Sequence, residues 1–246
     1  MSISPDRSLA RYRVLLVGTG GVGAPAAIAL AEAGLGTLVI ADEDTVEIEN
    51  LHRQLLFDDT DVGESKPDAT RRALERRKPS LSVEVFHGRA LPDTARELVS
   101  SVHAVVDATD NFPSRFLLAD ACHLAGVPVV HAAAVRWVGT VVSSAPGGGP
   151  CYRCLFEDIP VAAPDCQTAG IAGPVCGVIG GIAAEMALVA ASGQDRLFGK
   201  IATFDGLRDE LRLIDVPKRK TCPLCGLDPT IHDLVQTRYT GASCAA

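Results

Sequence analysis

Basic residues are in deficit in this chain of 246 residues, because 23 Lys and Arg stand against 30 Asp and Glu. The formal net charge is −7 and the pI is near 5.3, so we expect no nucleic-acid partner. Aromatic residues make up only 4% of the chain, yet apolar residues make up 47%, which is enough for a substantial core. The sequence also lacks internal repeats and low-complexity tracts, and its length suits one large α/β domain or two small ones.

A secretory signal is not expected, because no cationic start leads into an apolar core and a small-residue cleavage site. We therefore expect a cytoplasmic protein whose eight cysteines are thiols or metal ligands rather than a disulfide framework. One long apolar stretch, residues 169–193, raises the question of a membrane span. It contains Pro174, several glycines and Glu185, so we predict a buried core helix and no membrane partner.

Strand-like and helix-like segments alternate through the first half of the chain. This alternation predicts a Rossmann-like, mostly parallel sheet of α/β class with helices on both faces. The predicted strands are residues 13–17, 37–41, 82–86, 103–109, 127–133 and 139–145, and the predicted helices are residues 24–33, 67–77, 93–100 and 113–125.

The pattern changes after the Pro-Gly-Gly-Gly-Pro run at residues 146–150. Two further strands, residues 201–205 and 210–216, are predicted to pair with each other as an antiparallel addition. We expect a single domain over residues 1–246, made of a first half (1–145), a second half (146–232) and a loose tail (233–246).

Two C-x-x-C pairs, Cys151/Cys154 and Cys222/Cys225, lie in this second half. Four thiolates in two such pairs complete a tetrahedral zinc shell and leave no open position for water or substrate. The spacing therefore predicts a structural zinc clasp, with disulfides as the disfavoured alternative.

A glycine-rich loop, Gly18-Thr19-Gly20-Gly21-Val22-Gly23, connects the first predicted strand to the first predicted helix. Such glycines allow a tight turn and bring backbone N–H groups close to phosphate at a helix N-terminus. Asp42 ends the second strand, where an acid typically holds ribose hydroxyls. Alone, this pattern indicates a nicotinamide or flavin cofactor.

The residues downstream favour a triphosphate instead. Arg53 and Lys66 can neutralise phosphates, and the run Asp107-Ala108-Thr109-Asp110-Asn111 places a carboxylate for Mg²⁺ after a buried strand. A dehydrogenase needs neither feature, and no P-loop is present. We therefore expect a nucleoside triphosphate together with Mg²⁺, and the family resemblance described next implies that the triphosphate is ATP.

Together these motifs resemble the ThiF/MoeB/HesA group of adenylyltransferases, which are similar to ubiquitin-activating enzymes. The resemblance runs from about residue 13 to residue 226 and keeps the family's motif order. An equivalent enzyme in this family spends ATP on the C-terminal glycine carboxylate of a ubiquitin-like sulfur-carrier protein, forming an acyl-adenylate and pyrophosphate. The implied outcome is thiocarboxylate formation for thiamine, molybdopterin or a related pathway.

The resemblance also implies roles by position. Asp42 is implied to bind ribose, Asp110 to hold Mg²⁺, and Cys166 to take part in sulfur transfer, because it lies in a C-x-T-A-G context typical of the ThiF-like branch. Cys166 as an unreactive loop thiol stays open, as do a turn-capping role for Asp44 and a structural role for Asp107. The implied nucleotide-binding residues are Gly18, Gly20, Gly21, Gly23, Asp42, Asp44, Asn50, Arg53, Lys66, Asp110 and Asn111.

The implied partners are a carrier ending in Gly-Gly, a sulfur donor such as a cysteine desulfurase or rhodanese, and a second copy of the chain. The resemblance implies that the carrier docks on the zinc-clasped half (146–232), next to the nucleotide-binding half (1–145).

Two features depart from the family pattern. No R-Y-x-R-Q-like arm is visible, so Arg7, Arg11 or Arg13 would have to replace its arginine, and Glu49 stands where the family generally has serine. Alternatives are activation of a peptide or tRNA-nucleoside carboxylate, and a docking module without catalysis.

Overall fold

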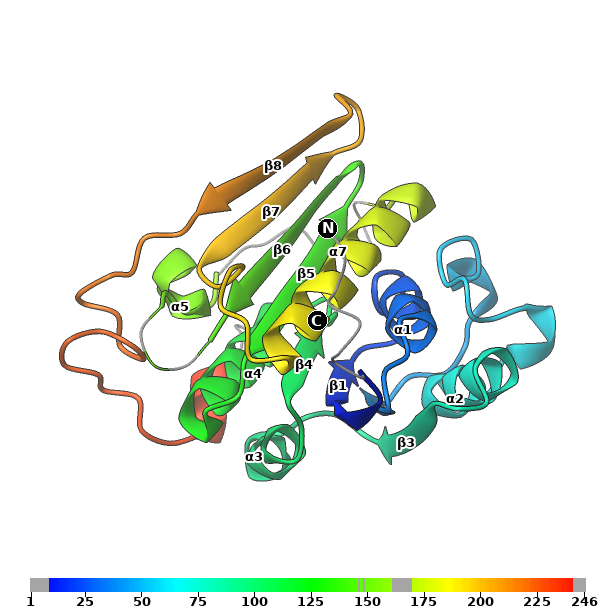
Figure 1. Ribbon diagram of the computed structural model, residues 1–246, viewed down its shortest axis with the longest axis horizontal. Coiled ribbons are helices and arrows are strands. Elements are labelled where there is room, and N and C mark those ends of the chain that lie inside the picture. The colour runs from blue at the N-terminus through cyan, green and yellow to red at the C-terminus, as the bar shows by residue number, and fades with distance from the viewer. Residues whose placement is uncertain (1–8, 146, 148, 161–169, 241–246) are drawn as a thin grey trace.

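The computed structural model describes residues 9–145, 147, 149–160 and 170–240. Its centre is one eight-stranded sheet with the order β3-β2-β1-β4-β5-β6-β7-β8 (Figure 1). The sheet is therefore continuous across both halves of the chain. Its strands are β1 (Arg13–Val17), β2 (Thr37–Asp42), β3 (Ser82–His87), β4 (Ala104–Asp107), β5 (Val129–Val135), β6 (Val138–Ser144), β7 (Lys200–Asp205) and β8 (Glu210–Asp215).

The strands β1 to β5 are parallel, and β6, β7 and β8 add to them in antiparallel fashion. Helical crossovers join the parallel strands, whereas Arg136 and Trp137 alone join β5 to β6, which forces a hairpin. The predicted fold class, a mostly parallel sheet with antiparallel C-terminal strands, is confirmed.

Helices cover both faces of this sheet (Figure 1). One aliphatic core lies between the sheet and α1, α2 and α7, and a second lies beneath α3 and α4. Pro25 is in the first turn of α1, where its missing N–H needs no partner. The helices are α1 (Gly23–Glu32), α2 (Lys66–Arg77), α3 (Pro92–Ser100), α4 (Phe112–Ala125), α5 (Tyr152–Leu155) and α7 (Gly173–Ala191), with 3-10 turns η1 (Leu9–Arg11), η2 (Ile48–Asn50), η3 (Asp59–Asp61) and η4 (Gln236–Tyr239).

Helix α7 corresponds to the apolar stretch that the sequence predicts as a core helix. It is long and apolar enough to cross a membrane, but 67% of its most apolar window is buried inside the protein. Residues along it, including Ile179 and Ala183, belong to the core shared with α1 and the sheet. The composition of α7 is therefore accounted for by packing.

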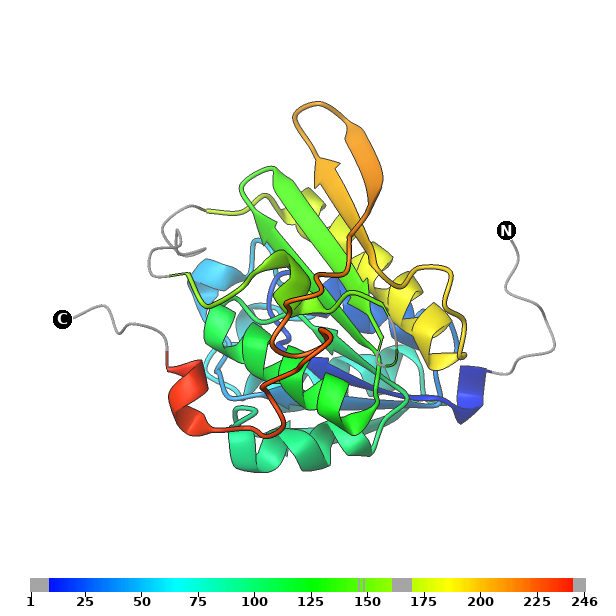
Figure 2. The ribbon, with the colours of Figure 1, turned by 90° about the vertical axis from the view of Figure 1, so that its left-hand side faces the viewer.

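A buried ion pair joins the C-terminal segment to the rest of the protein. Arg153 in α5 donates from Nε and Nη2 to the two carboxylate oxygens of Asp120 in α4, at 2.7 and 2.9 Å. Tyr239 in η4 donates to Asp120 Oδ2 at 2.8 Å, and Figure 2 shows η4 beside α4. Whereas the sequence predicts a loose tail from residue 233, Tyr239 is buried and hydrogen-bonded.

Candidate nucleotide and metal sites

The glycine loop makes a tight turn between β1 and α1. Gly18 has φ of +87°, a conformation that side-chain-bearing residues rarely adopt. A Cβ added at Gly23 would lie 1.9 Å from the Gly18 carbonyl oxygen, so only glycine fits there. These two glycines hold the turn against the start of α1, where a helix N-terminus favours anions.

Asp42, at the end of β2, is hydrogen-bonded to this loop. Its Oδ2 accepts from the backbone N and the Oγ1 of Thr19, at 2.7 and 2.8 Å, and its Oδ1 accepts from Asp44 N at 3.0 Å. The structure therefore places Asp42 beside the glycine loop, the position that a ribose-binding acid takes in this kind of fold.

The segment after η2 lies over the same loop. A Cβ added at Gly21 would come within 3.3 Å of Arg53 Cδ and 3.1 Å of Cys176 Sγ, and one added at Gly20 would lie 3.8 Å from Gln54 Nε2. Arg53 therefore reaches the loop although it is distant in sequence. Asn50 is held by Glu47, to which it donates at 2.8 Å.

Cys176, in α7, is buried. Burial raises the pKa of the Cys176 thiol to about 11, although the Arg53 guanidinium opposes the shift. This side chain is therefore a neutral thiol that packs under the loop rather than a nucleophile.

Lys66, the first residue of α2, forms an ion pair with Asp44. Its Nζ lies 2.7 Å from Asp44 Oδ2, and the backbone N of Lys66 donates to the Asp44 carbonyl at 2.9 Å. Asp44 therefore forms an ion pair with the Lys66 ammonium, rather than only capping a turn.

The last residue of β4 and the turn that follows it contain three polar side chains of different exposure. Asp107 is fully buried, and its Oδ1 accepts from Thr109 N at 3.0 Å and from Thr109 Oγ1 at 2.6 Å. Asp110 is exposed and receives the Asn111 amide at 3.3 Å. Asn111 also caps α4, because its Oδ1 accepts from Ser114 N at 2.9 Å.

Sequence reasoning missed two buried residues that hold this turn, His131 and Arg115. His131 Nδ1 lies 2.7 Å from Asp107 Oδ2, and Arg115 Nη2 donates to the carbonyls of Thr109 and Ala132. Burial by itself raises the pKa of Asp107, but Arg115, His131 and Thr109 hold the pKa of this carboxyl below its usual value. Asp107 is therefore a buried structural carboxylate, one of the two possibilities that the sequence leaves open.

The four cysteines of the C-x-x-C pairs come together at one point. All four sulfur atoms lie within 4.8 Å of one another, and the Cys151–Cys222 and Cys154–Cys225 distances are 3.5 Å. A tetrahedral Zn²⁺ with bonds of ~2.3 Å needs sulfur atoms about 3.8 Å apart, so this donor set fits zinc. Burial opposes ionisation of Cys222, but backbone N–H groups of Cys225 and Leu224 lower the pKa of its thiol.

Of the other residues named from the sequence, two lie outside the described part of the chain and two make local contacts. Cys166 and Arg7 lie outside the described residues. Arg11 donates to the hydroxyl of Tyr12 at 2.7 Å, and Arg13 pairs with Glu84 at the start of β1.

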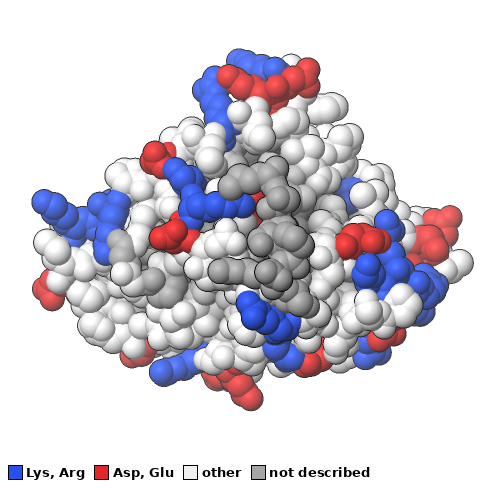
Figure 3. All heavy atoms as spheres, in the orientation of Figure 1, with Lys and Arg blue, Asp and Glu red and all other residues white. Residues whose placement is uncertain are grey.

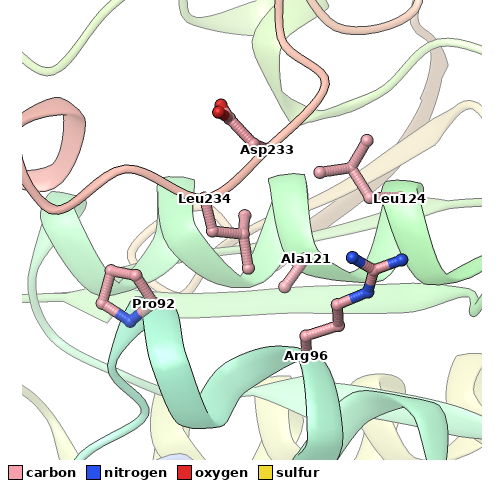
Figure 4. A pocket seen from close by; sticks show the side chains of 6 residues that line it. All are labelled: Pro92, Arg96, Ala121, Leu124, Asp233 and Leu234. Carbon is pink, nitrogen blue, oxygen red and sulfur yellow. The ribbon is translucent and has the colours of Figure 1, made fainter.

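Two small cavities lie away from the glycine loop. The larger, about 180 Å³, lies between α3, α4 and the C-terminal segment and is lined by Pro92, Arg96, Ala121, Leu124, Asp233 and Leu234 (Figure 4). None of the predicted nucleotide-binding residues lines it.

On the face in Figure 3, Lys and Arg form separate groups rather than one continuous band.

Comparison with known proteins agrees with these features. The model of the ThiF family matches residues 4–224. The chain is 38% identical over 235 residues to the "Sulfur carrier protein adenylyltransferase" of Thermus thermophilus, covering 92% of this chain and 87% of that protein. It is 34% identical over 227 residues to the "Sulfur carrier protein ThiS adenylyltransferase" of Escherichia coli, covering 92% and 90%. The names of both relatives agree with the predicted enzyme class.

Other relatives are longer. The chain is 35% identical over 240 residues to "Adenylyltransferase and sulfurtransferase MOCS3" of Dictyostelium discoideum, covering 96% of this chain but only 56% of that protein. The chain thus spans about half the length of such relatives. The crystal structure of E. coli MccB matches with a TM-score of 0.79 at 21% identity, covering 90% of this chain and 67% of MccB, a likeness of fold alone. On the family match and these identities, the chain belongs to the ThiF family.

Proposed function

We propose that this protein adenylates the C-terminal glycine carboxylate of a ubiquitin-like sulfur-carrier protein with ATP. The observation that carries the proposal is the meeting of Arg53 with the glycine loop at Gly21, beside the Asp42 carboxylate at the end of β2. Family membership and the names of the relatives support the same reaction.

The reaction joins two anions, so the site must supply positive charge and alignment. A carboxylate oxygen of the carrier attacks the α-phosphorus of ATP, and the bond from that phosphorus to the bridging oxygen of the β-phosphate breaks. Pyrophosphate leaves with the electron pair of that bond. Arg53, Lys66 and Asn50 bind the phosphates, Asp42 binds the ribose, and the loop amides of Gly18, Gly20, Gly21 and Gly23 line the nucleotide. This division needs no general base, because the attacking carboxylate is already ionised.

Asp110 is the proposed ligand for Mg²⁺, with Asn111 beside it. The carboxylate is exposed in the turn that follows the parallel strand β4, and among the described residues it accepts a hydrogen bond from the Asn111 amide. Mg²⁺ prefers oxygen ligands and completes its shell with phosphate and water, so one carboxylate suffices. The bound ion would neutralise charge on the pyrophosphate group.

The zinc-clasped half is the proposed docking surface for the carrier, within a single domain over residues 1–246. β8 is the outermost strand, and the β7–β8 hairpin projects from the molecule (Figure 2). Leu207, Leu211 and Leu213 on this hairpin are 73, 60 and 54% exposed. An open strand edge with exposed leucines suits a folded partner rather than a small molecule.

Downstream of adenylation, Cys166 is proposed to take part in transferring sulfur to the carrier, from a donor such as a cysteine desulfurase or rhodanese. A thiamine-type carrier is favoured over a molybdopterin-type carrier by the C-x-T-A-G context. Cys166→Ala should leave adenylation nearly untouched and stop thiocarboxylate formation. The protein is also proposed to be cytoplasmic and to work as a homodimer. The molar mass from light scattering tests the dimer.

The test is isotope exchange between pyrophosphate and ATP in the presence of a diglycine-ended carrier. Exchange that needs the carrier, Mg²⁺ and a free terminal carboxylate supports the proposal, and a carrier with an amidated C-terminus is the control. If a short peptide or tRNA supports pyrophosphate exchange and none of the carriers does, the alternative carboxylate substrates are favoured. ATP binding without any exchange would favour a docking module.

A further inference from the structure

The pairing of β4 with β5 places a histidine beside the buried carboxylate of the Asp110 turn. Asp107 and His131 are direct partners in the parallel register, so their side chains share one face of the sheet. Both are at most 1% exposed, and the 2.7 Å contact between Nδ1 and Oδ2 joins them. The carboxylate is acceptor-only, so the proton in this contact lies on His131 Nδ1.

The second carboxylate oxygen of Asp107, Oδ1, binds the turn that follows β4. This oxygen accepts both hydrogen bonds from Thr109, so the orientation of the carboxylate sets the backbone at residue 109. Asp110 follows directly in the chain. Arg115, in α4, donates to the Thr109 carbonyl of the same turn and to the Ala132 carbonyl of β5.

The contact with Asp107 is the one hydrogen bond that the His131 ring makes within the described residues. Its Nε2 is buried and has no hydrogen-bond partner within the described part of the chain, and its ring packs at 4.4 Å from the ring of Tyr152. A buried polar ring with one unpaired nitrogen is costly, so a leucine at this position would cost less if only packing were needed.

We propose that His131 is a positioning residue that, by donating to Asp107, holds residues 107–111 so that Asp110 is presented to a divalent cation. The inference rests on the proposed function for the identity of the cation site, but the hold on the turn is a property of the free protein. Outer partners of this kind change metal affinity by roughly 10- to 100-fold when they are lost.

The test compares two substitutions that differ in one hydrogen-bond donor. His131→Leu fills the space without a donor, whereas the amide of His131→Asn can still donate to Asp107. Asp120→Asn is the matched control, because it weakens another buried ion pair, with Arg153, outside the turn. All three are compared by thermal unfolding, so that a general loss of stability is measured separately.

The first measurement is amide hydrogen exchange in the protein free of nucleotide and metal. Exchange in peptides covering residues 107–111 should accelerate by about 10-fold or more in His131→Leu, return close to wild type in His131→Asn, and be unchanged in Asp120→Asn. Unchanged exchange in His131→Leu overturns the inference, and so does equal acceleration in His131→Asn.

The second measurement is binding of Mn²⁺, followed by electron paramagnetic resonance in the presence of ATP. The dissociation constant should rise by about 10-fold in His131→Leu and by less than about 3-fold in the other two variants. An unchanged constant in His131→Leu overturns the inference. If wild type binds no Mn²⁺ with ATP or exchanges no pyrophosphate with any carrier, the proposed function fails, and hydrogen exchange alone then decides whether His131 holds the turn.

Discussion

Lys66 Nζ lies 2.7 Å from Asp44 Oδ2, although the two residues differ greatly in exposure. The lysine side chain is 7% exposed and the aspartate side chain is 62% exposed. A buried ammonium is costly without a partner, so the exposed carboxylate stabilises the lysine at the edge of the nucleotide loop. A phosphate of ATP would then meet a cation that is already held in place.

This ion pair predicts unequal effects of its two members. Lys66→Met removes the cation but leaves Asp44 in water, so the fold should be kept and carrier-dependent pyrophosphate exchange should fall by about 100-fold or more. Asp44→Asn keeps the cation and should lower exchange by less than about 10-fold. Circular dichroism checks the fold. A Lys66→Met variant with full exchange would remove Lys66 from the phosphate site.

Asp110→Ala should abolish Mg²⁺-dependent adenylation without loss of fold. The side chain is exposed, so the free energy of unfolding should change by no more than about 0.5 kcal/mol. The rate of pyrophosphate–ATP exchange is measured over a series of Mg²⁺ concentrations. Asp195→Ala is the control, because it replaces another exposed aspartate. Equal Mg²⁺ dependence in the two variants would contradict the role of Asp110.

Cys151→Ser should release zinc and lower the unfolding temperature. The serine oxygen is a poor replacement for a thiolate, and the remaining three sulfurs leave the clasp open. Atomic emission of the purified protein gives the zinc content. Cys122→Ala, which changes a buried thiol in α4, should keep one zinc per chain, and zinc retained by both variants would argue against a four-cysteine site.

Acidification should destabilise the protein in part through His123. Burial lowers the pKa of His123 below its ordinary value of 6.5, with Asp120 opposing the shift and Lys218 adding to it. The unfolded chain therefore binds this proton more readily, so the stability contribution is present above the unfolded pKa and is lost as pH falls from there through the folded pKa. The unfolding temperature should drop between pH ~7.5 and ~5.5, and less steeply in His123→Gln. Parallel curves for the two proteins would exclude His123.

Much of the candidate site could be predicted because its motifs are local. The glycine loop needs only the sterics of Gly18 and Gly23, and a C-x-x-C pair places two thiols on one turn whatever the rest of the chain does. The same holds for Asp42, which ends the apolar run of β2, and for Asp110, which lies in the short turn just after the apolar run of β4. Adjacent residues in the sequence carry these patterns, so no knowledge of long-range pairing was needed.

The contacts of the buried polar groups were not predictable in this way. Asp107 meets His131 because β4 pairs with β5 in one register, and a slip of one residue would turn His131 to the other face. Cys176 reaches Gly21 because α7 packs beside α1, and Tyr239 reaches Asp120 because the last segment returns across α4. Local spacing thus specifies strands, turns and ligand types, while strand register and helix packing choose which distant side chains touch, since those contacts depend on the energy of the whole core.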